Sequence, residues 1–185
     1  MNSNHARLCG GPEWAAFLQT EVLPVVTRDV DFGEHMLEIG PGPGAATDWL
    51  RTKVKRLTAV EMDPEAAKAL EGRFENVEVV NADATDLPYP DDTFDSVGMF
   101  TMLHHVPTRA LQDKLLTEAL RVLRPDGSLV CSDSLPSDRL HHFHEEDTYN
   151  PVEPGTLLTR LQTIGFGAIT MMVDERLMFR AAKRP

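Results

Sequence analysis

The sequence predicts an α/β fold in which a doubly wound, mostly parallel β-sheet gains one antiparallel strand near the C-terminus. Three observations support this prediction. Strand-like apolar runs alternate with helix-like runs between residues 35 and 164, which is typical of a parallel sheet with crossover helices. A glycine-dense turn over residues 40–44 follows the first strand-like run directly. At the C-terminal end, only Asp174-Glu175 separates two strand-like runs, and so short a connection joins antiparallel strands.

The first predicted element is a helix that begins at Pro12, since proline is favoured in the first helical turn. The helix is expected to reach about residue 27. Pro24 should bend this helix or end it early, because proline has no backbone N–H. The apolar residues at helical spacing are Trp14, Phe17, Leu18, Val22 and Val25.

The elements that follow alternate in type, so crossover helices should cover both faces of the sheet. The whole chain, 1–185, is expected to form a single domain. The predicted strands are 35–39, 56–61, 77–80, 94–100 and 128–133. The predicted helices are 45–52, 64–73 and 107–123, followed by a helix from 155 to 164, a Gly165-Phe166-Gly167 break and the terminal hairpin.

Composition excludes some partners. The chain has 185 residues, 42% of them hydrophobic and 25% charged, which is ordinary for a water-soluble globular domain. The net charge of −11 argues against a nucleic-acid surface, which needs basic patches. No apolar run approaches membrane-spanning length and no segment resembles a signal peptide, so we expect no membrane partner.

The two cysteines, Cys9 and Cys131, provide no disulfide framework. Both are expected to stay reduced, which favours a cytoplasmic location. Cys131 lies in a strand-like run and is interpreted as a small buried hydrophobic residue. The oligomeric state stays open, with a homodimer among the alternatives.

The turn LEIGPGPG over residues 37–44 is the most informative stretch. Gly40, Gly42 and Ala45 satisfy the loose dinucleotide pattern G-x-G-x-x-G/A, so an NAD-dependent reductase is one alternative. The two prolines of the turn oppose it, because they remove backbone N–H donors that a pyrophosphate needs. Glu38 would also repel that anion. A cationic ligand with an amino group, such as S-adenosylmethionine, suits the turn better.

This turn resembles the first motif of the class I S-adenosylmethionine-dependent methyltransferases, E/D-x-G-x-G-x-G, and the likeness extends over roughly residues 12–183. The resemblance implies a Rossmann-like sheet of seven strands, S-adenosylmethionine as the cofactor and a methyl-transfer activity. The residues that match the motif are Glu38, Gly40, Gly42 and Gly44, with Pro41 inside it.

Glu61 ends the second predicted strand, and a carboxylate there can accept hydrogen bonds from both ribose hydroxyls. Met62 follows it and is expected on the same cofactor surface. Asp63 is a weaker candidate for the ribose contact, because a residue before Pro64 is better explained as a helix N-cap.

The next two strand ends complete the cofactor constellation. Residues 81–88 resemble the segment in which, in this family, an acid receives the adenine amino group and the next N–H meets the ring; Asp83 and Ala84 occupy those places. The strand 94–100 would pass under the methionine part of the cofactor, with Phe100 and Thr101 as contacts.

Two adjacent histidines follow this strand. His105 is interpreted as a brace that holds the loop by hydrogen bonding. His104 is expected to face the acceptor pocket.

Residues 134–154 are predicted to form a lid over the acceptor site, because they follow a strand end and hold three of the seven histidines. A histidine can remove a hydroxyl proton near neutral pH. His144 is the first candidate for this base, helped by Glu145 or Asp147, with His141 and His142 behind it. Asp133 and Tyr149 are expected to contact the acceptor. The alternative is that the segment is an ordinary solvated loop.

A divalent metal such as Mg²⁺ is a second way to activate a hydroxyl. The candidate ligands are His141, His142 and His144, with Asp133 or Asp147 nearby.

A polar lid and an aromatic content of only 6% favour O-methylation of a small polar acceptor, with a saccharide as one candidate. In overall appearance the chain resembles actinobacterial sugar O-methyltransferases of methylmannose polysaccharide synthesis. The enzymatic alternative is a C- or N-methyltransferase acting on a quinone-like or other metabolite. The non-enzymatic alternative is a cofactor-binding regulatory module.

Overall fold

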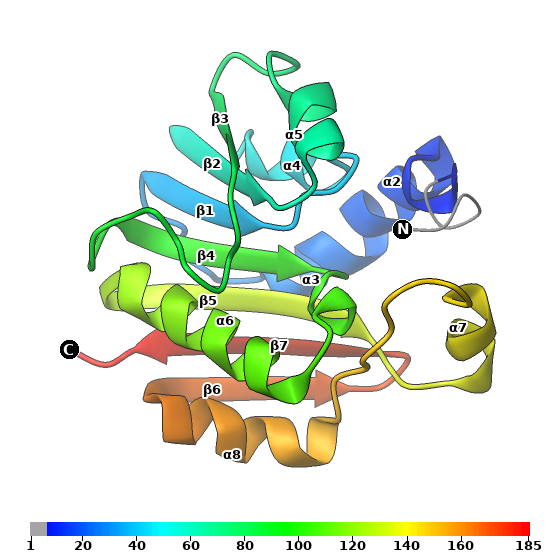
Figure 1. Cartoon of the computed structure of the whole chain (residues 1–185). Helices are drawn as coiled ribbons and strands as arrows, with labels where there is room; N and C mark the ends of the chain where they lie inside the picture. The colour runs from blue at the N-terminus through cyan, green and yellow to red at the C-terminus, as the bar shows by residue number, and fades with distance from the viewer. Residues whose placement is uncertain (1–6) are drawn as a thin grey trace.

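A computed structural model describes residues 7–185 as a seven-stranded sheet in the order β3-β2-β1-β4-β5-β7-β6 (Figure 1). Strand β7 runs antiparallel to both of its neighbours, β5 and β6, and the remaining pairs are parallel. The predicted fold class is therefore confirmed. The strands are β1 (His35–Ile39), β2 (Arg56–Glu61), β3 (Val77–Asn81), β4 (Phe94–Phe100), β5 (Leu123–Ser134), β6 (Phe166–Val173) and β7 (Arg176–Lys183).

The helices follow the predicted order, although several are shorter than predicted because turns take up their ends. No helix among residues 7–185 is both long and apolar enough to cross a bilayer. The helical elements are α2 (Pro12–Phe17), η1 (Leu18–Val22), α3 (Leu23–Val26), α4 (Thr47–Leu50), α5 (Pro64–Leu70), η2 (Leu103–His105), α6 (Arg109–Val122), α7 (Asp138–Phe143) and α8 (Pro154–Ile164).

The N-terminal helix does not end early at Pro24. Its middle part, η1, is a π-helical turn, and α3 continues through Pro24 to Val26. A π turn re-routes the backbone hydrogen bonds around a residue that cannot donate one. It also rotates the residues after it, so Leu23 and Val26 are buried and the predicted Val25 is only half-buried. Leu18 and Val22 are buried as predicted, whereas Phe17, before the turn, is 37% exposed.

Two apolar clusters cover the two faces of the sheet, as predicted for a doubly wound fold. Side chains alternate between them along each strand: in β5, Leu129 and Cys131 belong to one cluster and Val130 to the other. The first cluster packs against α6 and α8, and the second against α3 and α4. Cys131 is buried and unpaired, as expected.

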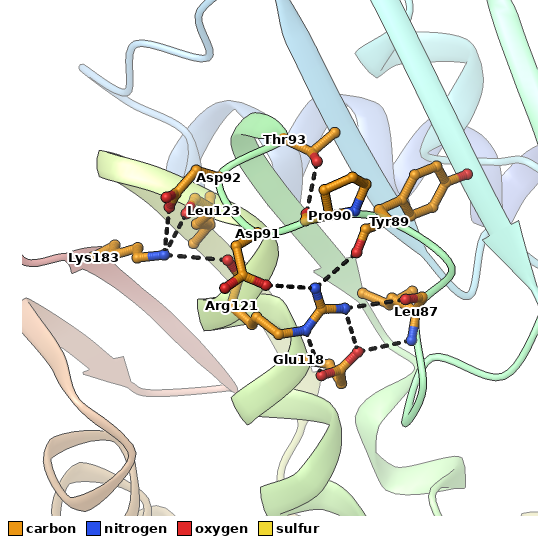
Figure 2. Close-up of polar contacts among 10 residues, drawn as sticks. All are labelled: Leu87, Tyr89, Pro90, Asp91, Asp92, Thr93, Glu118, Arg121, Leu123 and Lys183. Atoms are coloured by element: carbon orange, nitrogen blue, oxygen red, sulfur yellow. Dashed lines mark hydrogen bonds and ion pairs between the residues drawn. The ribbon is translucent and has the colours of Figure 1, made fainter.

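A polar cluster around Arg121 ties the loop before β4 to the end of α6 (Figure 2). The guanidinium group makes five hydrogen bonds: two to the Glu118 carboxylate, one to Asp91, and one each to the carbonyls of Leu87 and Tyr89. We call these residues the Arg121 brace.

Candidate active site

The carboxyl ends of β1, β4 and β5 lie at one edge of the sheet, which is where ligands bind in open α/β folds. The strands deliver to this edge the glycine turn, Thr101 and Asp133. Helices α2 and α7 stand beside the same edge (Figure 1). The sequence-predicted site residues therefore gather at one end of the molecule.

The glycine turn needs its glycines for two different reasons. Gly40, Gly42 and Gly44 all have positive φ angles, of 66°, 51° and 84°, which L side chains rarely adopt. A Cβ on Gly44 would lie 2.5 Å from Leu70 Cδ1, so this glycine permits close packing against α5. A Cβ on Gly42 would meet nothing within 4 Å. Gly42 therefore borders open space, in which a ligand can approach the backbone.

Glu38 is a buried carboxyl group beneath this turn. It is 2% exposed, and its Oε2 has no hydrogen-bond partner within residues 7–185. Burial raises the pKa of Glu38 to about 7, and the nearby Glu61 carboxylate adds to the rise. An ammonium group next to Glu38 would compensate the buried charge, so the site suits a cationic ligand.

Glu61 at the end of β2 accepts hydrogen bonds from the backbone N–H groups of Gly42 and Asp63, each at 3.0 Å. These bonds hold its carboxylate beside the open space at Gly42. Met62 is 70% exposed at the same strand end, where an exposed apolar side chain offers a surface for a flat ring. The Asp63 side chain accepts from the N–H groups of Glu65 and Ala66, so Asp63 is the N-cap that was expected.

The ends of β3 and β4 lie further along the same edge. Asp83 is exposed, and its Oδ1 accepts from the N–H of Thr85, with Ala84 between them. Phe100 is buried at the end of β4. The next residue, Thr101, has a φ of 55°, which is strained for a β-branched residue. Such strain is often found at functional sites.

His104 and Asp133 form a buried pair at the centre of the edge. His104 Nδ1 lies 2.5 Å from Asp133 Oδ1, and the two side chains are 4% and 2% exposed. Asp133 also accepts from the backbone N–H groups of His104 and Ser134. An ionised Asp133 can only accept, so the proton between the two groups is carried by His104 Nδ1; in the neutral ring, Nε2 then presents a lone pair. His104 Nε2 is buried and has no hydrogen-bond partner among the described residues.

His144 lies next to this pair. Its ring centroid is 5.0 Å from that of His104, and it stacks on Tyr149 at 4.6 Å. Its Nδ1 contacts the Leu140 carbonyl at 2.7 Å. Burial lowers the pKa of His144, which favours the neutral ring. The carboxylate that bonds His104 is thus Asp133. Asp147 lies close to His144: its backbone N–H donates to the His144 carbonyl at 2.9 Å, and its charge acts to raise the pKa of His144.

The structure does not bring His141 and His142 to this pair. Both are exposed on α7, and His142 Nδ1 contacts the Asp138 carbonyl of its own helix at 2.7 Å. The His141 ring lies at the margin of the site, with its centroid 6.1 Å from that of Tyr149. Helix α7 ends at Phe143, and the buried position falls on the next residue, His144. The predicted metal set His141, His142 and His144 is therefore not assembled.

A different trio is close enough to hold one ion. The ligand atoms of His104, His105 and His144 all lie within 4.8 Å of one another. The Nδ1 atom of His105 contacts the Thr148 carbonyl at 3.2 Å. That contact is the loop-bracing role expected of His105.

Two residues that sequence reasoning missed hold the two histidine-bearing segments together. Gln112 Nε2 on α6 donates to the carbonyls of Leu103 and Asn150, at 3.1 and 2.8 Å. Asn150 donates from its backbone N–H to the His104 carbonyl at 2.7 Å and from its side chain to the Val106 carbonyl at 2.9 Å. A glutamine and an asparagine carry no local pattern that predicts such long-range bonds.

The comparisons with known proteins agree with this architecture. Residues 37–131 match the model of a family described as "Methyltransferase domain". The chain is 33% identical over 127 residues to a demethylmenaquinone methyltransferase of Listeria welshimeri, with 68% of this chain and 42% of that protein aligned. It is 36% identical over 112 residues to the methyltransferase GfsG of Streptomyces halstedii, covering 57% of this chain and 39% of that protein. The chain thus spans about two fifths of the length of these relatives.

Solved structures share the fold at lower identity. A methyltransferase described as S-adenosylmethionine-dependent, from Aquifex aeolicus, superimposes with a TM-score of 0.75 at 19% identity, over 98% of this chain and 97% of that one. A chain in the complex of the Haloferax volcanii Trm112 activator with a methyltransferase gives 0.77 at 14% identity, over 100% and 99%. These similarities support the fold alone.

Proposed function

The chain belongs to the methyltransferase domain family, and on that premise we propose that it is an S-adenosylmethionine-dependent methyltransferase acting on a hydroxylated acceptor. In this proposal the His104–Asp133 pair removes the hydroxyl proton. The observation that carries it is the unpartnered Nε2 of His104, held in place by a buried carboxylate at the carboxyl edge of the sheet.

The residues at this edge fit S-adenosylmethionine. Its ammonium group would compensate the buried Glu38 carboxylate, and the open space at Gly42 admits a ligand next to the Glu61 carboxylate. Met62 is the exposed apolar surface for the adenine ring. The sulfonium of the cofactor supplies an electrophilic methyl group. Asp83, Ala84, Phe100 and Thr101 remain the candidates for the other cofactor contacts.

The protein's own contribution is to prepare the acceptor oxygen. His104 Nε2 takes the proton as the oxygen–methyl bond forms and the sulfur–methyl bond breaks. Asp133 then stabilises the imidazolium and keeps the ring in the productive tautomer. His144 and Tyr149 pack around His104 and limit access of water. We assign the base role to His104 instead of His144, because the buried Asp133 carboxylate bonds His104 Nδ1, whereas His144 Nδ1 contacts a backbone carbonyl.

The acceptor class is the finer part of the proposal. The polar side chains of residues 134–154 favour a small polar hydroxyl compound, with a saccharide as one candidate. The name of the Listeria relative favours the alternative, C-methylation of a quinone-like ring. Removal of a ring hydroxyl proton also activates the adjacent carbon, so the same pair would serve both reactions. The methylated atom of the product distinguishes them.

A divalent metal is a second candidate for activating the hydroxyl. In His104, His105 and His144, Nδ1 is engaged by an oxygen atom, an arrangement typical of imidazoles that ligate metals through Nε2. An all-nitrogen set favours a zinc-like ion over the Mg²⁺ that the sequence suggested. Dialysis against chelator, followed by the absorption spectrum after Co²⁺ addition, tests this candidate. Activity that survives chelation supports the simple base.

The proposed function is tested with labelled S-adenosylmethionine and a panel of sugars, phenols and reduced quinones, with NMR analysis of the methylated atom. We expect His104→Gln to lower turnover by about 10²–10⁴-fold and to leave cofactor affinity unchanged. His141→Gln is the matched control, because its ring is exposed. Equal activity of the two variants would contradict the assignment of the base, and absence of cofactor binding would contradict the proposed function itself.

A further inference from the structure

Arg176 is the first residue of β7 and lies at the edge of the sheet that carries the candidate active site. It pairs with Ser134, the residue after Asp133 on β5. Met178, two residues further along β7, packs against the core cluster on the α3 side of the sheet. Because residues two apart share a face of a strand, Arg176 faces that side too.

Two aromatic rings of α2 lie against the Arg176 guanidinium group. Its Cζ is 5.7 Å from the centroid of Trp14 and 5.5 Å from that of Phe17. Gln19, in the next helical turn, donates from Nε2 to the Ala45 carbonyl at 3.0 Å. This bond holds the helix against the end of the glycine turn. Arg176 and the rings of Trp14 and Phe17 therefore lie beside both the glycine turn and Asp133.

The Arg176 side chain is half-buried, and two of its three guanidinium nitrogens lie out of contact with solvent. Within residues 7–185, its Nε and Nη2 atoms are buried and have no hydrogen-bond partner. Burial lowers the pKa of Arg176, and the nearby charge of Asp133 opposes this only in part. Asp133 already accepts hydrogen bonds from His104 and from two backbone N–H groups. A desolvated cation without a bonded anion costs stability, so the site is built for an anion that arrives from outside.

We propose that Arg176, backed by Trp14 and Phe17, binds an oxyanion carried by the methyl acceptor, either a carboxylate or a phosphoryl group. The planar guanidinium group can donate two parallel hydrogen bonds to either anion. The rings of Trp14 and Phe17 would pack against the remainder of the bound acceptor. The assignment of this anion to the acceptor rests on the proposed function. It narrows the acceptor class from any polar hydroxyl compound to a hydroxylated acid or a phosphate ester.

Anion binding can be measured without turnover. The chain has two tryptophans, so Trp49→Phe leaves Trp14 as the fluorescent reporter next to Arg176. In this background, benzoate tests the carboxylate and phenyl phosphate tests the phosphoryl group, with benzyl alcohol as the neutral analogue. We expect at least one of the two anions to change Trp14 fluorescence and the alcohol not to. Arg176→Met should weaken the anion by about tenfold or more.

Arg180→Met is the matched control, because Arg180 lies on the same face of β7 and donates to the Arg28 carbonyl. It should leave anion affinity unchanged. Arg176→Met should also unfold at the same or higher urea concentration than the parent protein, since it removes an uncompensated buried charge. A strong loss of stability would instead indicate a structural role and overturn the inference. So would failure of both anions to bind.

Turnover separates this inference from the proposed function. Each neutral acceptor in the panel is compared with its acidic or phosphorylated analogue, such as glucose with glucuronate and glucose 6-phosphate. We expect Arg176→Met to raise KM for the charged analogue and to leave cofactor affinity unchanged. Methyl transfer with equal KM values in parent and variant would overturn the anion site alone. Anion binding without any methyl transfer would overturn the proposed function alone. A loss confined to S-adenosylmethionine affinity would assign Arg176 to the cofactor and overturn the inference.

Discussion

Arg121 and Arg176 lie near opposite edges of the same sheet, and their guanidinium groups differ in how well they are satisfied. Arg121 makes five hydrogen bonds to acids and carbonyls, and Lys183, at the far end of β7 from Arg176, extends the same cluster through Asp92 (Figure 2). Arg176 has two buried nitrogens without a partner among the described residues. Both guanidinium groups pack against other side chains of the protein. Only the charge of Arg121 is compensated by acids and carbonyls to which it bonds.

The difference separates polar groups that stabilise the fold from polar groups that await a ligand. Glu38, His104 and Arg176 each have a buried polar atom without a hydrogen-bond partner in residues 7–185, and all three lie at the carboxyl edge, where we assign them to the cofactor or the acceptor. Native proteins satisfy nearly all buried polar atoms. A concentration of exceptions at one edge is therefore evidence for a binding site, and it costs the free protein some stability.

The largest effect on stability is expected at Arg121, whose guanidinium group is fully hydrogen-bonded. Arg121→Met should lower the free energy of unfolding by about 3 kcal/mol, because it leaves two carbonyls without a donor and Glu118 with only the backbone N–H of Leu87. The free energy of unfolding of Arg121→Lys should lie between those of the parent and Arg121→Met, since a lysine keeps the charge but lacks the planar guanidinium group that bonds several acceptors at once. Urea denaturation measures both, and S-adenosylmethionine affinity should stay unchanged. A loss smaller than that of Arg176→Met would invalidate the comparison.

At Glu38, the cost of a buried carboxylate without a hydrogen-bond partner on Oε2 in residues 7–185 should appear as a dependence of stability on pH. Its pKa is raised from 4.5 to about 7, so between these values the folded state binds more protons than the unfolded state, and the raised pKa costs stability as pH rises through this window. Glu38→Gln should therefore be more stable than the parent at pH 8, by on the order of 2 kcal/mol, and equal to it below pH 4.5. Urea titrations at several pH values measure this.

The same substitution should weaken S-adenosylmethionine binding, and the affinity of the parent protein should fall as pH drops below about 7. A protonated Glu38 no longer attracts the ammonium group. Calorimetry at pH 6 and pH 8 measures the change. Affinity that does not vary with pH would remove Glu38 from the cofactor site.

At Glu61 we expect an effect on cofactor affinity and not on stability. Glu61→Ala should weaken S-adenosylmethionine binding by about 1.5–3 kcal/mol for each charge-assisted hydrogen bond to ribose that is lost. Water that replaces the carboxylate as acceptor would reduce this loss. The free energy of unfolding should change little, because the carboxylate lies at a half-exposed strand end, where water can accept from the two turn N–H groups in its place. Calorimetry measures the change in cofactor affinity, and urea denaturation measures the change in the free energy of unfolding. Unchanged affinity would move the ribose contact elsewhere.

The smallest effects are expected at His141 and His142. Both side chains are exposed, so their alanine variants should change the free energy of unfolding by no more than about 0.5 kcal/mol and leave turnover near that of the parent. A large loss of turnover in either variant would bring α7 into the acceptor site and revive their predicted role.

Local sequence signals predicted most elements of the fold. Strands β1, β2 and β4 begin and end where the apolar runs do, because their period is set by neighbouring residues. Strand β5 was predicted too short: Leu123 pairs with Phe94 across a register shift, and a long-range pairing of this kind leaves no local pattern. The π turn before Pro24 was missed for a similar reason, since the packing of α3 against the sheet decides whether the helix continues.

The sequence by itself determined the order of elements, the glycine turn and the acids that end β1 and β2. These depend on backbone sterics and on the period of buried side chains, both of which are local. Only the tertiary structure decided that Asp133 bonds His104 and that His141 and His142 are exposed. It also decided that Arg176 lies beside Trp14 with two buried nitrogens that have no hydrogen-bond partner within residues 7–185. Each of these depends on which side chains meet across strands far apart in the chain. Burial and partner choice are properties of the packed molecule, so no single stretch of residues encodes them.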